Sequence, residues 1–293
     1  MITALSVGPV TLNVRDLDAS SRFYREVIGM TELRRAEDHV VLGAGDTELV
    51  ELHATPDAPA YPNAPGLFHM AIRLSTRTDL STWVYDLFSH QGEFQSYLQG
   101  ASDHGVSEAL YLNDPEGNGV EVYADRPESM WPRKPNGQID MYTARLDIES
   151  LVSIAKPDGG GLRQLPARSD MGHVHLRVND VKAAKEFYID TLGLDLTLAL
   201  GDSALFVSTD RYHHHIGLNS WESRGSEPRP LGALGLDSVT LRFELSDTTV
   251  PSIRRPQAFA NWLASRHISA TIGEDNTLLV TDPAGNRVRF VVD

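Results

Sequence analysis

The chain has 293 residues, of which 41% are hydrophobic and 23% are charged, and its formal net charge is −14. This length suffices for two domains, and the composition is that of a folded globular protein rather than a disordered chain. The negative charge opposes binding to nucleic acid, and no apolar run reaches the roughly 18 residues that a membrane helix needs. The sequence has no cysteine, so any metal must be held by histidine and carboxylate side chains.

The N-terminal residues, Met1 to Pro9, contain no basic stretch and no long apolar stretch. This start does not have the pattern of a secretory signal. We therefore expect a cytoplasmic protein with neither nucleic acid nor membrane as a partner.

Two sequence patterns occur once in each half of the chain. The segment Arg15 to Met30 matches the segment Asn179 to Leu194, and both contain a Phe-Tyr pair. The turn-like stretch Asp114 to Asn118 recurs as Asp282 to Asn286, with the pattern Asp-Pro-x-Gly-Asn. Repetition at so long a period indicates a duplication.

Each Phe-Tyr segment predicts a helix with a strand before it and short strands after it. Asp16 and Asp180 are suited to cap the helix start, and Gly29 and Gly193 are suited to end it. Apolar residues between these ends recur at helical spacing. The neighbouring strands are expected at 10–14, 39–42 and 49–53 in the first half, and at 174–178, 204–208 and 215–218 in the second.

The other two segments of the duplication predict the same order of elements. We expect strands at 67–74, 109–112 and 120–123 with a helix at 80–90, and then strands at 238–243, 277–280 and 288–292 with a helix at 257–266. In each closing hairpin Asp, Pro and Gly stand where a type I turn favours them.

The chain is thus predicted to contain four βαβββ modules, at 4–57, 64–125, 169–222 and 233–293. The expected domains are an N-terminal domain, residues 1–125, and a C-terminal domain, residues 169–293. Residues 126–168 are rich in Pro, Gly and Arg and read as a linker with one short helix at 148–155.

One histidine begins the second module and one glutamate ends it. His69 and Glu121 both lie in apolar strand patterns, where Val or Ile is usual. A single histidine at a strand start is more often a hydrogen-bonded polar residue than a ligand. Our interpretation is that these two residues belong to a metal site.

With these modules and turns the sequence resembles the vicinal oxygen chelate superfamily, the glyoxalase and extradiol dioxygenase fold. Four modules in one chain most resemble its catechol 2,3-dioxygenase branch, and the resemblance covers the whole chain apart from the linker. It implies an α+β fold in which paired modules form two cupped, barrel-like sheets. It also implies that metal ligands come from the start of the first strand and the end of the last strand of paired modules.

At the positions that this resemblance marks, the modules differ in the ligands they offer. Pairing the second module with the third gives His69, Glu121 and His173, a 2-His-1-carboxylate set suited to Fe(II), with Mn(II) as a second option. Pairing the first module with the second gives His69, Glu121 and Glu51, because Pro9 cannot coordinate. We prefer the pairing of the second module with the third, because it completes the 2-His-1-carboxylate set.

The resemblance also implies a histidine that moves protons during ring opening, in the run Arg211 to Leu218. Histidine suits this role because its pKa lies near neutrality. The register favours His214, and in a strand His213 and His215 would face the opposite way. The roles of His213 and His215 stay open.

Two further residues match the pocket of the family. Tyr111 stands ten residues before Glu121, as the family tyrosine does, and is expected to bond a substrate oxygen. His104 is the matching histidine, although it lies two residues closer to Tyr111 than in familiar members. His175 is expected to face the same cavity as His173, in a role that the sequence leaves open.

These assignments predict an extradiol dioxygenase that inserts O2 into catechol or a substituted catechol next to the vicinal hydroxyls, with a homo-oligomeric assembly. One alternative is a glyoxalase-like, metal-dependent isomerase or thiol transferase, which favours a fourth protein ligand. The other is a non-catalytic small-molecule-binding protein of the bleomycin-resistance type, in which ligand binding would not depend on His69 or Glu121.

Overall fold

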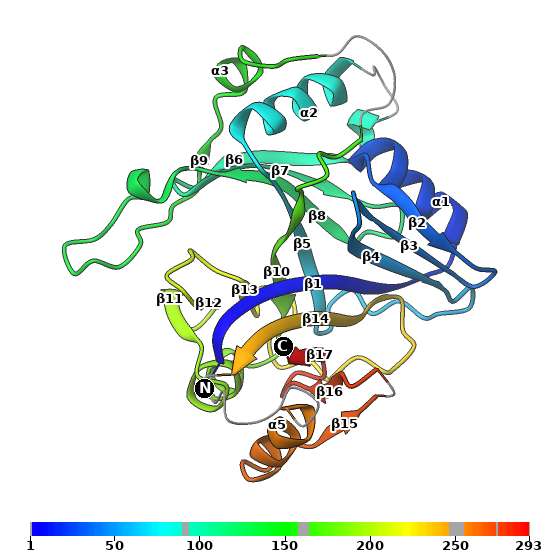
Figure 1. Ribbon diagram of the computed structural model, residues 1–293, viewed down its shortest axis with the longest axis vertical. Helices are drawn as coiled ribbons and strands as arrows, with labels where there is room; N and C mark the ends of the chain where they lie inside the picture. Colours follow the sequence, from blue (N-terminus) through cyan, green and yellow to red (C-terminus); the bar gives the residue numbers. More distant parts are fainter. Residues whose placement is uncertain (1, 90–93, 158–163, 246–254, 274, 293) are drawn as a thin grey trace. The chain divides into compact units, whose positions relative to one another are not determined.

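The computed structural model describes residues 2–89, 94–157, 164–245, 255–273 and 275–292 (Figure 1). The chain divides into two units by its internal contacts. Unit 1 comprises Met1–Leu12, Pro59–Phe68 and His173–Asp293, and unit 2 comprises Asn13–Ala58 and His69–Gly172. The domain boundaries expected from the duplication, 1–125 and 169–293 with the linker 126–168, stay a prediction.

The order of elements confirms four modules of one strand, one helix and three further strands. The first contains β1 (Ile2–Val14), α1 (Leu17–Phe23), β2 (Thr31–Arg35), β3 (His39–Ala44) and β4 (Thr47–Ala54). The second contains β5 (Gly66–Leu74), α2 (Arg77–Ser89), β6 (Leu98–Asp103), β7 (Ser107–Asn113) and β8 (Gly119–Asp125). The third contains β10 (Asp170–Arg177), α4 (Val181–Lys185), β11 (Asp195–Leu200), β12 (Ala204–Ser208) and β13 (Ile216–Asn219). The fourth contains β14 (Gly235–Leu245), α5 (Arg255–Ala264), β15 (Ala270–Ile272), β16 (Leu278–Thr281) and β17 (Arg287–Val292).

Strand pairing shows how the modules combine. In the second, third and fourth modules the first strand pairs in parallel with the last, as β5 does with β8, β10 with β13 and β14 with β17. Between modules, β5 pairs with β10 and β1 pairs with β14. The expected pairing of the second module with the third is therefore confirmed, and the first module pairs with the fourth.

The helices begin and end close to the expected residues, with one difference in type. The carboxylates of Asp16 and Asp180 accept backbone N–H bonds at the starts of α1 and α4, as predicted. Each of these helices continues as a π-helical turn, at Tyr24–Ile28 and Glu186–Thr191, rather than as regular α-helix. In the linker, α3 (Ile148–Val152) confirms the short helix and is accompanied by a short strand, β9 (Ala144–Arg145). His90, the expected end of α2, lies outside the described residues.

The two repeated sequence patterns meet in the structure. In unit 2 the Tyr24 hydroxyl donates to Asp114 at 3.0 Å, and in unit 1 the Tyr188 hydroxyl donates to Asp282 at 3.1 Å. All four side chains are buried, and this burial raises the pKa of both tyrosines well above its usual value. The π-helical tyrosine of one module thus anchors the closing turn of the next.

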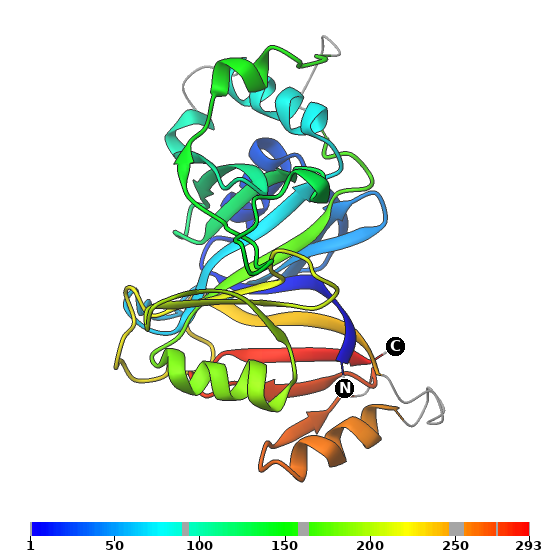
Figure 2. The same cartoon turned by 90° about the vertical axis from the view of Figure 1, so that its left-hand side faces the viewer.

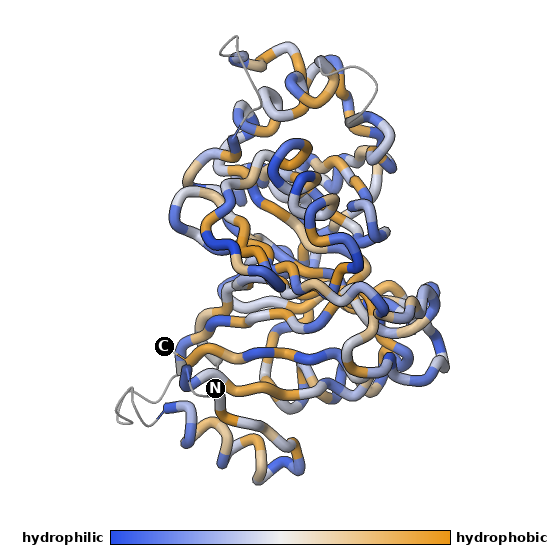
Figure 3. Tube along the Cα trace, turned by 90° about the vertical axis from the view of Figure 1, so that its right-hand side faces the viewer, coloured by the Kyte–Doolittle hydropathy of each residue, from blue (hydrophilic) through white to orange (hydrophobic). Residues whose placement is uncertain are grey.

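Apolar residues follow the strands in both units, while turns are mostly hydrophilic (Figure 3). In unit 1, helix α5 lies beside β15 in both ribbon views (Figures 1 and 2). Its buried Phe259 packs against Phe243 and Phe290, with ring centroids 4.8 and 5.6 Å apart. Among the described residues, no helix has the length and apolar character needed to cross a membrane.

Candidate metal centre

Parallel strands β5 and β8 bring His69 and Glu121 together. The register places Ala71 opposite Glu121 and His69 opposite Gly119. His69 Nε2 lies 3.1 Å from Glu121 Oε2, and both side chains are buried. Burying a carboxylate costs free energy unless the carboxylate is paired or bound to a metal. The contact with His69 therefore provides a partner for Glu121 inside an otherwise apolar sheet.

His173 completes a cluster with these two residues. It follows Gly172 on β10, and one ligand atom from each of His69, Glu121 and His173 lies within 4.8 Å of the other two. Three atoms at such separations share a point at most roughly 2.8 Å from each, so small side-chain shifts reach the first-row metal distance of about 2 Å. Two imidazoles and one carboxylate form the donor set of non-haem Fe(II) sites, and this set fits the expected metal.

The alternative ligand Glu51 lies outside this cluster. Its carboxylate bonds His53 Nε2 at 2.9 Å on β4. Within the described part of the chain, the cluster of His69, Glu121 and His173 is the only group of three or more histidine and carboxylate residues with ligand atoms this close together.

Gly172 is a residue whose importance the sequence analysis missed. A Cβ at this position would lie 1.9 Å from the hydroxyl oxygen of the fully buried Tyr123. A glycine inside a strand marks a close approach of another group to the backbone, and this was the signal available in the sequence. The close approach sets the path of β10 directly before His173.

Tyr111 and His104 lie together near the cluster. The antiparallel register of β7 and β8 places Tyr111 opposite Glu121, and the rings of Tyr111 and His69 are 5.6 Å apart. Burial, followed by the Glu121 carboxylate, holds the pKa of Tyr111 well above its usual value, so its hydroxyl stays protonated. His104 Nε2 lies 2.7 Å from that hydroxyl.

The short spacing between His104 and Tyr111 is accommodated by a tight turn between β6 and β7. The His104 backbone N–H donates to the Ser107 carbonyl at 2.9 Å. The two side chains therefore meet even though fewer residues separate them than the family pattern led us to expect.

The histidine run differs from the strand that was expected. Residues 211–215 form a loop, β13 starts only at Ile216, and Asp210 and Arg211 have φ values of 54° and 62°. Because the loop has no strand alternation, His213 and His214 lie side by side, with their Nδ1 atoms 2.8 Å apart. The prediction that His213 faces away from His214 was therefore wrong.

Both of these histidines lie near His173. The ring of His214 is 4.2 Å from the His173 ring, and the ring of His213 is 6.1 Å from it. His215 bonds Ser208 Oγ at 2.8 Å instead. The third module thus places a pair of imidazoles, rather than a single one, beside His173.

His175 lies in an aromatic group. Its ring is 5.1 Å from Phe68, 5.4 Å from Phe206 and 5.4 Å from Trp221. In the register of β10 and β13 it stands opposite Gly217, whose Cβ would lie 2.8 Å from the imidazole. These contacts give His175 a packing role in unit 1.

Comparisons with known proteins place these features in a family. Residues 6–122 and 170–290 match the model of the Glyoxalase/Bleomycin resistance protein/Dioxygenase superfamily. A catechol-2,3-dioxygenase of Bacillus subtilis (strain 168) is 40% identical over 294 residues, which cover 98% of this chain and 97% of that protein. A manganese-dependent 2,3-dihydroxybiphenyl 1,2-dioxygenase of Geobacillus genomosp. 3 is 28% identical over 132 residues, which cover 45% of this chain and 39% of that protein.

Two solved structures have the same fold. A putative dioxygenase from Bacillus subtilis subsp. subtilis str. 168 has a TM-score of 0.63 at 12% identity, and the match covers 100% of this chain and 86% of that chain. Glyoxalase I from Zea mays has a TM-score of 0.58 at 17% identity, and the match covers 99% of this chain and 92% of that chain. The expected α+β fold is confirmed, and the whole-chain match at 40% identity confirms the expectation of a dioxygenase-type enzyme. The chain belongs to the Glyoxalase/Bleomycin resistance protein/Dioxygenase superfamily.

Proposed function

We propose that this chain is an extradiol dioxygenase that uses O2 to cleave catechol or a simple substituted catechol next to the vicinal hydroxyls. The observation that carries the proposal is the buried cluster of His69, Glu121 and His173. It occurs in a chain that is 40% identical, over nearly its whole length, to a protein named catechol-2,3-dioxygenase.

In this proposal His69, Glu121 and His173 hold one divalent metal ion. Fe(II) is the first choice, and Mn(II) is the second because one relative is named as manganese-dependent. A bound ion of this kind supplies chelation of the catecholate and a route for electron density from the ring to dioxygen. A set of only three protein ligands leaves positions for substrate and dioxygen.

We assign proton transfer to His214. Its ring lies 4.2 Å from that of His173, and its Nδ1 faces the Nδ1 of His213 at 2.8 Å. One of these two nitrogens must carry a proton and the other must accept it, so each ring fixes the orientation of the other. His214 Nε2 is then the atom that exchanges protons with the substrate during ring opening.

We assign the orientation of substrate and dioxygen to Tyr111 and His104. The Tyr111 hydroxyl has one proton, and it donates this proton to a catecholate oxygen when His104 Nε2 is itself the donor to the hydroxyl oxygen. The Tyr111 hydroxyl lies 2.7 Å from His104 Nε2, so the two side chains act as one hydrogen-bonded unit.

A glyoxalase-like reaction is less well supported by the strand register. Ala71 stands opposite Glu121 in the second module, and His175 stands opposite Gly217 at the matching place in the third. The position where a fourth, carboxylate ligand would be expected therefore holds glycine.

The experiment that tests the proposal is oxygen uptake. Protein is loaded anaerobically with Fe(II), or with Mn(II) in parallel, and mixed with catechol in air. We expect uptake together with a yellow ring-opened product, and loss of both in His69→Ala. His39→Ala, which removes a half-exposed histidine on β3 outside the cluster, is the matched control and should retain activity.

Two results would overturn this proposal in different directions. Stoichiometric, tightly bound metal without oxygen uptake would indicate the glyoxalase-like reaction. Catechol binding that is unchanged in metal-free protein and in His69→Ala would indicate a binding protein of the bleomycin-resistance type.

Three further expectations belong with this proposal. They are a cytoplasmic location, a homo-oligomeric state, and domains that follow the duplication at residues 1–125 and 169–293. Cell fractionation, light scattering coupled to size exclusion, and limited proteolysis across residues 126–168 test them in turn.

A further inference from the structure

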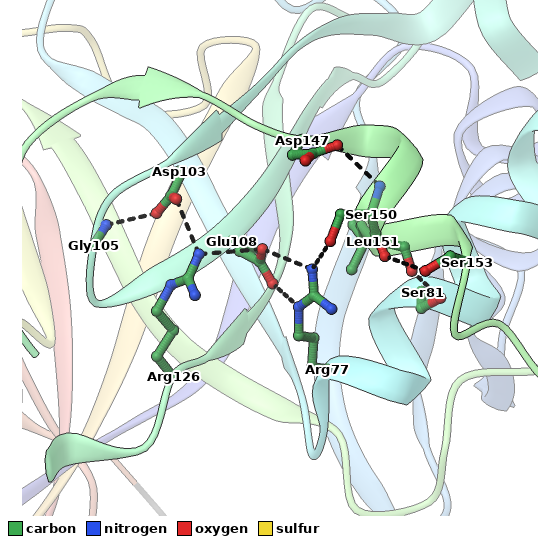
Figure 4. A network of polar contacts seen from close by, with 10 residues as sticks. All are labelled: Arg77, Ser81, Asp103, Gly105, Glu108, Arg126, Asp147, Ser150, Leu151 and Ser153. Carbon is green, nitrogen blue, oxygen red and sulfur yellow. Dashed lines mark hydrogen bonds and ion pairs between the residues drawn. The ribbon is translucent and has the colours of Figure 1, made fainter. Parts of the chain in front are cut away.

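A buried glutamate in unit 2 is held by two arginines (Figure 4). Glu108, at the start of β7, is only 4% exposed. Arg77 of α2 donates to both of its oxygens, at 2.5 and 3.1 Å, and Arg126, which follows β8, donates to one of them at 3.2 Å. Bidentate contacts between charged groups are strong and fix geometry.

The same network reaches the turn between β6 and β7. Arg126 Nη2 donates to Asp103 Oδ2 at 2.9 Å as well as to Glu108. The other oxygen of Asp103 accepts the Gly105 backbone N–H at 2.8 Å (Figure 4). Asp103 therefore connects the buried charge cluster to the turn that contains His104.

The turn itself allows little freedom. Gly105 has a φ of 75°, in the left-handed region, and a Cβ there would lie 2.6 Å from the Tyr142 ring. The Tyr142 carbonyl oxygen lies 2.9 Å from His104 Nδ1, so the Tyr142 backbone is also close to the turn.

These contacts determine which nitrogen of the His104 ring is a hydrogen-bond donor. A carbonyl oxygen only accepts, so the proton at this contact must belong to Nδ1. In the neutral ring Nε2 is then an acceptor for the Tyr111 hydroxyl at 2.7 Å, and in the charged ring it donates to the same oxygen. In both states Nδ1 keeps its proton and donates it to the Tyr142 carbonyl oxygen.

We infer that the network of Arg77, Glu108, Arg126 and Asp103 is a positioning device that holds His104 as the Nδ1–H form with Nε2 toward Tyr111. None of the four touches the metal cluster, so they act through His104 and the turn rather than on the reacting atoms. The consequence for catalysis rests on the function proposed above, whereas the consequence for the His104 ring does not.

The first test is NMR of protein labelled with 15N-histidine. We expect a slowly exchanging Nδ1–H resonance that is assigned to His104 by its loss in His104→Gln. It should disappear in Asp103→Ala, which removes both the Arg126 contact and the Gly105 contact. Asp103→Asn keeps an acceptor for Gly105 and should weaken the resonance without removing it.

Asp237→Ala is the matched control. It breaks the Asp237–Arg287 pair of unit 1, whose side chains are 18% and 25% exposed, against 23% and 26% for Asp103 and Arg126. The resonance should be unchanged in this variant. Arg126→Lys keeps the positive charge but loses the planar guanidinium that contacts Asp103 and Glu108 together. It provides a second variant if Asp103→Ala does not fold.

The second test is activity with catechol. A ring displaced by about 1 Å costs roughly 100-fold in rate, so Asp103→Ala should lower kcat by 10- to 100-fold with little change in KM. A retained Nδ1–H resonance together with unchanged kcat in Asp103→Ala would overturn the inference. If wild-type protein shows no dioxygenase activity, the proposed function fails, and the NMR result alone decides whether the network positions His104.

Discussion

Replacing Gly172 with alanine is expected to destabilise the fold and to weaken metal binding at the same time. The new Cβ would lie 1.9 Å from the Tyr123 hydroxyl, 2.8 Å from Tyr123 Cζ and 3.0 Å from Arg73 Cβ. Non-bonded heavy atoms need about 3.5 Å, so the ring or the strand must move by roughly 1.5 Å. Because Tyr123 is fully buried, its ring is surrounded by other side chains and cannot relieve the contact by turning into solvent. Overpacking of this kind typically costs about 1–3 kcal/mol, and we expect the upper end.

Urea unfolding of the metal-free protein measures this cost, and titration with Fe(II) measures the effect on the site. Gly100→Ala on β6 is the control, because no atom lies within 4 Å of its added Cβ, and its effect should stay within about 0.5 kcal/mol. In a Tyr123→Phe background the atom at 1.9 Å is absent, so Gly172→Ala should cost less there. Equal unfolding midpoints for Gly172→Ala and Gly100→Ala, without coupling to Tyr123, would refute the argument from packing.

Three more outcomes follow from the described contacts. Tyr188→Phe removes a donor from the buried Asp282 carboxylate and should destabilise by about 1–3 kcal/mol in urea unfolding, whereas Tyr85→Phe, on a partly exposed side chain, should be near neutral. Glu121→Gln should weaken Fe(II) binding by more than about 100-fold, the upper end of what outer-shell partners cost, as measured by metal content after dialysis. His214→Gln should lower kcat by roughly 10²–10⁴-fold while the metal content stays at the wild-type level, and full activity in this variant would remove His214 from the mechanism.

Most of the fold could be predicted because the same order of short hydrophobic patterns recurs four times along the chain. A single stretch such as Ala204 to Ser208 is ambiguous, but the same order of elements in four segments leaves few alternatives. Capping by Asp16 and Asp180 was predictable because the chemistry of a helix start is local. The π-helical turns were not, since hydrophobic periodicity does not distinguish them from α-helix. They coincide with Tyr24 and Tyr188, whose hydroxyls donate to carboxylates that lie 90 and 94 residues later in the chain.

The candidate site was predictable where it depends on strand positions. His69, Glu121 and His173 were selected from strand ends, and their ligand atoms lie close together. Prediction failed at His213, because the loop after β12 has left-handed residues at Asp210 and Arg211, which no alternation rule anticipates.

The network around Glu108 could not be predicted for a different reason. A glutamate and two arginines far apart in sequence are ordinary surface residues until the fold brings them together. Only the meeting of α2, β7 and the segment after β8 shows that Glu108 is buried and paired.

In the proposed function the metal ligands come from one pair of modules, and the residues at the corresponding strand positions of the other two modules explain why. At the positions that would supply ligands, the first and fourth modules have Pro9, Ser238 and Arg289. The Pro9 side chain has no atom that can coordinate a metal, and the positive charge of Arg289 would repel one. Their remaining candidate, Glu51, is engaged by His53.

Within the second and third modules the fourth position is also closed. Gly217 occupies the place that corresponds to Glu121, and its absent side chain leaves room for the His175 ring, which a Cβ would approach to 2.8 Å. A carboxylate at 217 would therefore require His175 and its aromatic neighbours to move. The packing of unit 1 thus favours glycine rather than a carboxylate at position 217, in agreement with the set of three protein ligands that we propose.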